Sequence, residues 1–89
     1  MLFMIIERFH DNDMLPIYRR LRDNGRMLPA GLTYVDSWVD PSFSRCFQLM
    51  ECSDPQLLEQ WASRWRDLME FEFVPVRRSK EVVAMMSPS

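Results

Sequence analysis

Apolar residues recur along the chain with two periods, one typical of strands and the other of helices. Four segments rich in β-branched and aromatic side chains predict strands: residues 2–9 (LFMIIERF), 32–39 (LTYVDSWV), 45–52 (RCFQLMEC) and 70–77 (EFEFVPVR). Apolar side chains at helical spacing occur in residues 14–21 and again in residues 57–68. The pattern therefore predicts strand, helix, two strands, helix and strand, in that order.

Capping signals mark where the predicted helices begin and end. Asp13 is a favourable N-cap for the first helix, and Asn24-Gly25 is a strong stop signal at its end. Ser53 and Gln56 have capping-box spacing before the second helix. A short final helix is expected over residues 79–86. This β-α-β-β-α-β order predicts an α+β, ferredoxin-like sandwich, in a single domain over residues 1–89.

The predicted strands are apolar on both faces, which an antiparallel sheet with one solvated face should not be. In the first strand, Leu2, Met4 and Ile6 oppose Phe3, Ile5 and Phe9; in residues 45–50, Phe47 and Leu49 oppose Cys46, Gln48 and Met50; in residues 32–39, Leu32, Tyr34 and Trp38 oppose Val35 and Val39. Two main helices can cover only one face. We therefore expect the other face to be covered by a second copy of the chain, in a homodimer, or to line a ligand cavity.

Composition and charge narrow the choice of partner. Of the 89 residues 47% are apolar, more than a thin small-domain core requires, which again favours a homodimer. The net charge of −2 argues against nucleic acid as a partner, because nucleic-acid-binding domains are normally basic. The RNA-recognition fold shares the element order, but residues 45–50 (RCFQLM) lack the glycine of its third-strand motif.

The same sequence argues against a membrane partner and for a reducing compartment. The N-terminal apolar stretch, residues 2–6, is far shorter than the ~20 residues of a membrane span. Cys46 and Cys52 lie six residues apart in one predicted strand, about 20 Å, which is too far for a disulfide. We expect two reduced thiols in a cytoplasmic protein.

Several stretches carry a resemblance to a known family: IERF, YRRLRDNGRMLPAGLTYVDSWV, RCFQLMEC, WASRWRDL and FEFVPV. Together they resemble the bacterial domain of unknown function 3303, from Met1 to about Glu81. That family is similar to the dimeric α/β-barrel group, in which two ferredoxin-like sheets pack face to face. The resemblance implies a dimer. Relatives in the broad group include cofactor-independent monooxygenases, small isomerases and haem-degrading enzymes, but the resemblance assigns no catalytic residue.

Candidate chemistry is sparse, and no metal or cofactor is expected. His10 is the single histidine, in a predicted turn beside Asp11 and Asp13; a solvated turn and a divalent-metal site are both compatible with it, and we favour the turn. Haem-binding relatives place their axial histidine on a helix, and neither main helix has one. Two glycines are too few for a phosphate-binding loop.

The remaining candidate is a small apolar pocket between sheet and helices. Gln48, in the middle of a central strand, either forms a structural hydrogen bond or orients a ligand. Trp61 and Trp65, one helical turn apart, either pack in the core or wall a pocket. The candidate pocket residues are Arg8, Tyr18, Arg26, Tyr34, Trp38, Gln48, Trp61 and Trp65.

Two functions remain open from the sequence. One is a structural or interaction dimer, or a domain that binds a small molecule. The other is a cofactor-independent enzyme, monooxygenase-like or isomerase-like, acting on a small apolar substrate. The lack of an evident acid–base pair in an apolar setting weakens the enzyme hypothesis.

Overall fold

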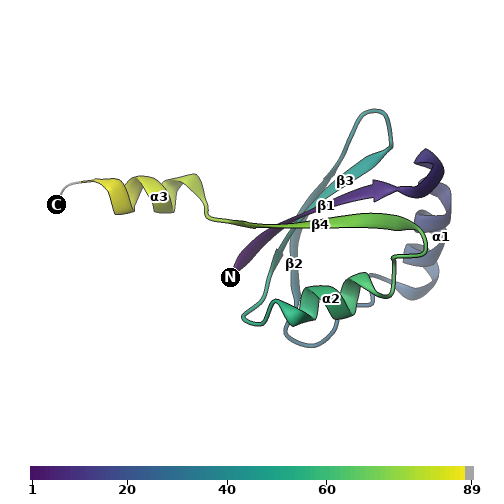
Figure 1. Ribbon diagram of the computed structural model, residues 1–89, viewed down its shortest axis with the longest axis horizontal. Helices are drawn as coiled ribbons and strands as arrows, with labels where there is room; N and C mark the ends of the chain where they lie inside the picture. Colours follow the sequence, from purple (N-terminus) through teal and green to yellow (C-terminus); the bar gives the residue numbers. More distant parts are fainter. Residues whose placement is uncertain (88–89) are drawn as a thin grey trace.

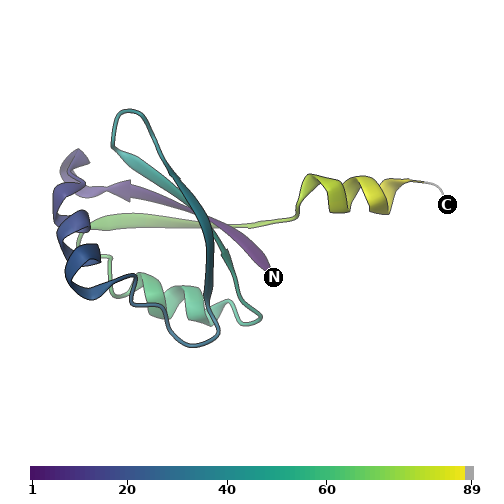
Figure 2. The same cartoon turned by 180° about the vertical axis from the view of Figure 1, so that it is seen from behind.

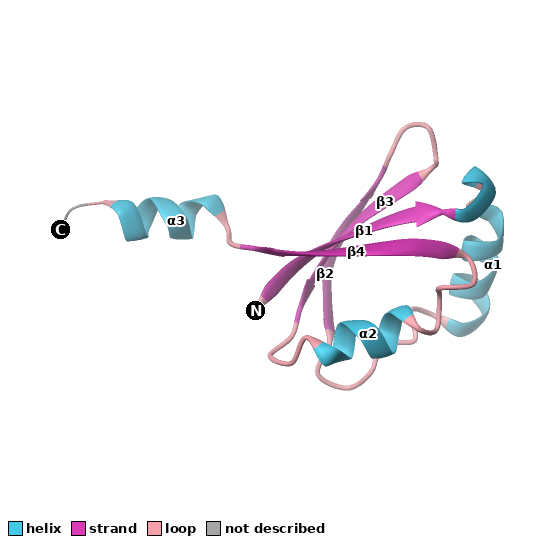
Figure 3. Cartoon of the chain, in the orientation of Figure 1, coloured by secondary structure: helices cyan, strands magenta, loops and turns pink. Residues whose placement is uncertain are grey.

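The computed structural model describes residues 1–87 and has the predicted order of elements. The strands are β1 (Leu2–Phe9), β2 (Thr33–Val39), β3 (Arg45–Glu51) and β4 (Met69–Val76), and the helices are α1 (Leu15–Asn24), α2 (Gln56–Ala62) and α3 (Ser79–Met86). The strands form one antiparallel sheet in the order β2-β3-β1-β4 (Figures 1 and 3). This architecture is α+β and compatible with the ferredoxin-like fold.

Local capping explains small differences from the predicted helix boundaries. The Oδ1 atom of Asp13 accepts the backbone N–H of Leu15 at 3.0 Å, so the predicted cap residue does precede α1. Before α2 the capping oxygen comes from Asp54, not from Ser53: its Oδ1 accepts the N–H of Gln56 at 3.0 Å. The N–H of Gly25 bonds the carbonyl of Leu21 at 2.8 Å, and the φ of +66° at Gly25 then turns the chain out of the helix and ends α1.

The second helix is shorter than predicted. Residues 63–68 form turns instead of continuing α2. The N–H of Trp65 bonds the carbonyl of Ala62, and the N–H of Leu68 bonds that of Trp65, at 2.9 Å in both cases. These i→i+3 bonds wind the chain more tightly than an α-helix does. A further short 3-10 turn, His10–Asn12, links β1 to α1 where the sequence predicted a plain turn.

The helices α1 and α2 lie on one side of the sheet (Figures 1 and 2), and the core lies between them and the strands. Alternate residues of β1 (Phe3, Ile5, Glu7 and Phe9) are buried on this covered face. The register sets Glu7 between Cys46 of β3 and Phe71 of β4. The helices therefore cover this face of the sheet, and a cavity remains between them and the strands.

The opposite, open face of the sheet has no helix over it in either view (Figures 1 and 2). It carries half-buried apolar side chains from three strands: Leu2, Met4, Ile6, Phe47, Leu49, Val74 and Val76. The predicted apolarity of both faces is therefore present in the structure.

Two face assignments were wrong, and a β-bulge is the reason: Trp38 does not share the face of Tyr34, whereas Val39, paired with Cys46, does. The pairing of β2 with β3 skips Val35, so that Tyr34 pairs with Met50 and Asp36 with Leu49. One extra residue reverses the alternation of side chains. Tyr34 stays on the covered face, whereas Trp38, paired with Phe47, lies on the open face and is 50% exposed.

The final helix extends away from the rest of the chain, beyond the end of β4 (Figures 1 and 2). Its apolar side chains stay in solvent; Val83, Met85 and Met86 are each more than 60% exposed. Within residues 1–87, no helix combines the length and apolarity needed to cross a bilayer.

Candidate functional site

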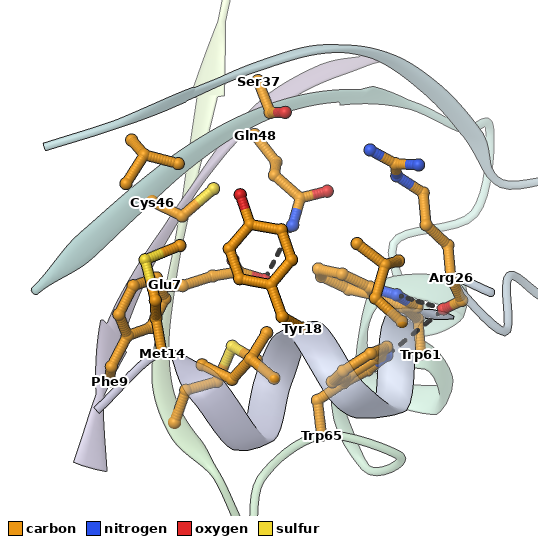
Figure 4. Close-up of a pocket in the computed structure, with 14 residues that line it drawn as sticks. Glu7, Phe9, Met14, Tyr18, Arg26, Ser37, Cys46, Gln48, Trp61 and Trp65 are labelled. Atoms are coloured by element: carbon orange, nitrogen blue, oxygen red, sulfur yellow. Dashed lines mark hydrogen bonds between the residues drawn. The ribbon is translucent and has the colours of Figure 1, made fainter. Parts of the chain in front are cut away.

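A cavity of about 180 Å³ lies between the covered face of the sheet and helix α1 (Figure 4). It is walled mainly by apolar side chains from both main helical segments and the ends of the strands. Its lining residues are Glu7, Phe9, Met14, Ile17, Tyr18, Leu21, Arg26, Ser37, Val39, Cys46, Gln48, Trp61, Trp65 and Met69. Tyr18 of α1 and Val39 of β2 are 54% and 42% exposed, so the cavity opens to solvent between these two elements.

Two polar side chains from neighbouring strands meet at the cavity. Glu7 of β1 is only 3% exposed although it is a carboxylic acid. The Nε2 atom of Gln48, on β3, donates a hydrogen bond to Glu7 Oε2 at 2.9 Å (Figure 4). In the antiparallel pairing, Glu7 lies opposite Cys46 and Gln48 lies opposite Ile5. The side chains of Glu7 and Gln48 are therefore diagonal neighbours on the same face of the sheet. The sheet register therefore builds this pair.

Burial decides the ionisation of Glu7. Loss of water raises its pKa from 4.5 to about 7, although hydrogen bonds from Gln48 and Cys46 and the charge of Arg26 act in the opposite direction. No cation forms an ion pair with Glu7 among residues 1–87. A carboxyl group with a pKa near neutrality, at the edge of an apolar cavity, can both accept and release a proton under ordinary conditions.

Burial also raises the pKa of the thiol beside this carboxyl group. The pKa of Cys46 rises to about 12, first because the thiol is buried and then because Glu7 is negative when ionised. Cys46 is therefore a neutral thiol and a poor nucleophile at neutral pH. Both cysteines are free.

The second oxygen-bearing group, the amide of Gln48, is incompletely satisfied. Its Oε1 atom is buried and has no hydrogen-bond partner among the described residues. In Figure 4 this oxygen faces the side of the cavity where Arg26 lies. Buried polar atoms are nearly always paired, so an orphaned acceptor at a cavity indicates that something else supplies the donor.

The aromatic wall is rigid because two indoles share one acceptor. Trp61 Nε1 and Trp65 Nε1 both donate to the backbone carbonyl of Arg26, at 3.1 and 3.2 Å (Figure 4). Trp61 also packs edge-to-face on Phe71, with ring centroids 5.2 Å apart. These contacts fix the loop after α1 against the cavity wall.

At the rim, Arg26, Tyr34 and Ser37 contact one another. The guanidinium of Arg26 stacks on the ring of Tyr34, 3.6 Å from its centroid. The hydroxyls of Tyr34 and Ser37 lie 2.6 Å apart and share a hydrogen bond. Arg26 is the one cation among the residues that line the cavity.

The structure brings together five of the eight residues proposed from sequence. Tyr18, Arg26, Gln48, Trp61 and Trp65 line the cavity. Tyr34 lies behind Arg26 without lining it. Arg8 and Trp38 do not reach it: both lie on the open face, and Arg8 forms an exposed ion pair with Glu72 at 3.3 Å.

Sequence reasoning missed Glu7, the residue with the most unusual environment. The signal was available, because position 7 continues the alternation of Phe3, Ile5 and Phe9 and so falls on their face. The sequence showed no evident acid–base pair in an apolar setting, because Glu7 and Gln48 lie on different strands and meet only through the pairing of β1 with β3. An ionisable group in an apolar setting is therefore present.

Metal-binding residues do not gather at this cavity. No cluster of three or more potential ligands occurs among residues 1–87. The His10 ring is exposed, and its Nδ1 lies 3.1 Å from the carbonyl oxygen of Asp67.

Comparisons with known proteins give one finding. A family model described as "Domain of unknown function (DUF3303)" matches residues 1–89. No curated protein and no solved structure matches the chain.

Proposed function

Since the chain belongs to the DUF3303 family, whose description assigns no role, we propose from the site itself that the protein binds a small, largely apolar molecule in the cavity beneath its sheet. The orphaned Gln48 Oε1 is the observation that carries this proposal. An acceptor left without a donor destabilises an empty site and is satisfied when a ligand donates to it.

The size and lining of the cavity support a ligand of about one ring. Apolar cavities of about 150 Å³ accept benzene, and this one measures about 180 Å³. Ligand sites typically combine apolar walls with a few polar groups that fix orientation. Here the indoles of Trp61 and Trp65 form the wall, and Glu7 with Gln48 supplies the polar groups.

Tryptophan fluorescence provides a direct test. The chain has three tryptophans, and Trp38→Phe would leave only the two at the cavity as reporters. Titration of this variant with toluene should give a saturable change in emission. The matched Trp38→Phe, Ile17→Phe double variant, which fills part of the cavity, should lose that response. A response that stays linear, or that survives the filling substitution, would count against the pocket.

The open face supports a second part of the proposal, that the protein acts as a homodimer joined through the sheet. Seven half-buried apolar side chains cover this face, and an antiparallel sheet exposed to water is normally polar there. A second copy is the partner of matching chemistry, because a two-fold interface pairs an apolar face with itself. The free thiols support the cytoplasmic location that we propose with it.

Glu7 favours a second candidate function, a cofactor-independent enzyme of the isomerase type. Proton transfer at carbon needs a base whose pKa lies near the working pH, and the pKa of Glu7 meets this requirement. Single-ring ketones incubated in D₂O with the protein should exchange their α-hydrogens, as followed by NMR. The Glu7→Gln variant should exchange them no faster than buffer. Equal exchange rates for both proteins would exclude this candidate.

A further inference from the structure

We infer that the cavity selects single-ring ligands that carry a hydroxyl or N–H donor, that Gln48 Oε1 accepts this donor, and that the carboxyl group of Glu7 holds the amide in the direction this requires. The inference rests on the small-molecule function proposed above and names the chemical class of the ligand. It is carried by the geometry of the Glu7–Gln48 pair and by the state of the polar groups around it.

The hydrogen bond between the two side chains fixes the direction of the amide. Gln48 Nε2 donates to Glu7 Oε2 at 2.9 Å, so the amide oxygen must face away from the carboxylate. That oxygen is buried and unpartnered. The amide therefore presents an acceptor, and a ligand that complements it must bring a donor.

None of the donors among the described residues hydrogen-bonds Gln48 Oε1. Arg26 stacks on Tyr34, and the Ser37 hydroxyl is engaged with the Tyr34 hydroxyl at 2.6 Å. Both indole N–H groups donate to the backbone carbonyl of Arg26. The Tyr18 hydroxyl and the Arg26 guanidinium also line the cavity, yet neither hydrogen-bonds this oxygen. The acceptor is therefore left for a donor from a molecule inside the cavity.

The charge state of Glu7 determines how strong this selection is. The groups that face it are the thiol of Cys46 and the amide of Gln48 on β3, the phenol of Tyr18 on α1 and the cation of Arg26 on the following loop. The segment 61–65 and β4 present only apolar or indole side chains there, from Trp61, Trp65, Met69 and Phe71.

An ionised Glu7 holds the amide in its observed direction. A protonated Glu7 can itself donate, which allows the amide to turn and offer its NH₂ group to the cavity instead. The preference for a donor ligand should therefore be stronger above the pKa of Glu7 than below it.

A matched pair of ligands tests the inference: p-cresol and p-xylene, which differ by a hydroxyl in place of a methyl group. In a purely apolar cavity the hydroxyl loses its water without compensation, so p-xylene binds more tightly. In this cavity we expect p-cresol to bind roughly tenfold more tightly than p-xylene at pH of about 8, where the phenol is still neutral. Binding would be measured by NMR titration of the full-length wild-type protein.

Two variants assign the effect to the named groups. Gln48→Met removes the acceptor at similar volume and should reverse the order, so that p-xylene becomes the tighter ligand. Glu7→Gln should keep a preference for p-cresol but remove its dependence on pH. Binding of p-xylene to each variant shows that its cavity is folded, and Gln48→Leu serves the same purpose if Gln48→Met does not fold.

The outcomes separate this inference from the proposed function. If neither ligand binds the wild type, the small-molecule pocket itself is wrong. If both bind and p-xylene binds as tightly as p-cresol or more tightly, the pocket stands and the donor selection is overturned. An unchanged order in both Gln48 variants would also overturn it.

Discussion

The covered and open faces of the sheet are both apolar, yet they differ in whether their charged side chains are buried or exposed to water. On the covered face Glu7 is buried beside a cavity and forms no ion pair with any of residues 1–87. On the open face the next residue of β1, Arg8, pairs with Glu72 at the surface, where both side chains are about half exposed. Apolar side chains thus surround the carboxyl group of Glu7 on the covered face, whereas the charged groups of the open face remain in contact with water.

Glu7 and Glu72 differ in environment because one is shielded from water and the other is not, although they lie close together in space. Glu72 pairs in register with Ile6, the residue just before Glu7 in β1, so the two carboxyl groups lie close together on opposite faces of one sheet. Only Glu7 loses its hydration, and its pKa rises to about 7. A buried carboxylate without an ion pair lowers stability and is typical of sites where chemistry or binding needs it.

The largest effect should come from removing the aromatic support of the covered face. Trp61 is 2% exposed and contacts both Phe71 and the Arg26 carbonyl. We expect Trp61→Ala to lower the free energy of unfolding by about 3–5 kcal/mol, from lost burial and a cavity. Urea unfolding would measure it. Trp38→Ala, on the open face, is the matched control, and an equal loss there would erase the distinction between the faces.

The next effect concerns pH. The folded state keeps a proton on Glu7 up to about pH 7, whereas the unfolded state releases it near 4.5. Stability from this group is therefore complete below about 4.5 and is lost as pH rises through 7, by up to ~3 kcal/mol. We expect Glu7→Gln to be more stable than the wild type at pH of about 8, and the difference to vanish near 4.5.

Urea unfolding at both pH values would measure this difference. Glu72→Gln, on the open face, is the control and should show no such dependence on pH. A Glu7→Gln variant that is less stable than the wild type at the higher pH would contradict the assigned environment of Glu7.

A smaller effect is expected from charging the open face. Leu49→Lys places a cation among the half-buried apolar residues through which we propose that two copies associate. Association should weaken by about 2 kcal/mol or more, as expected when a charge is buried among apolar residues of an interface. In light scattering across protein concentrations, we expect the variant to stay monomeric at concentrations where the wild type forms the proposed dimer. Gln60→Lys on α2 should leave the dimer intact, and a monomeric wild type would refute the interface.

The smallest effect should follow loss of the surface ion pair on the open face. Arg8 and Glu72 are 3.3 Å apart and their side chains are about half exposed. Exposed pairs contribute up to about 1 kcal/mol, so Arg8→Ala should change the free energy of unfolding by less than that. A larger loss in urea unfolding would show that this pair is shielded from water, for example by a second copy.

Much of the fold was predictable because periodicity reports strands and helices directly. The strand order along the chain and the final helix match the structure within one residue at each boundary. The bulge at Val35 was not predictable, because the alternation of apolar and polar residues does not reveal an extra residue in a strand. The bulge moved Trp38 to the other face. The second helix ended early because residues 63–68 tighten into i→i+3 turns.

The site was only partly predictable for a related reason. Tyr18, Trp61 and Trp65 follow from helical spacing, which reports the face that turns toward the sheet. The contact of Glu7 with Gln48 joins residues 41 positions apart and depends on strand register. Alternation can place each residue on a face, but pairing between strands decides which of them touch.

The protruding helix α3 has a consequence for the motions of the chain. A helix of eight residues is marginal in water when nothing packs against it, and Val83 and Met85 here are more than 60% exposed. Such a segment interconverts between helix and coil in about 0.1–1 μs. Its amide protons should therefore exchange with solvent orders of magnitude faster than that of Ile5, at the centre of the sheet. The chain thus combines a slow-exchanging body with a fast-exchanging C-terminal arm.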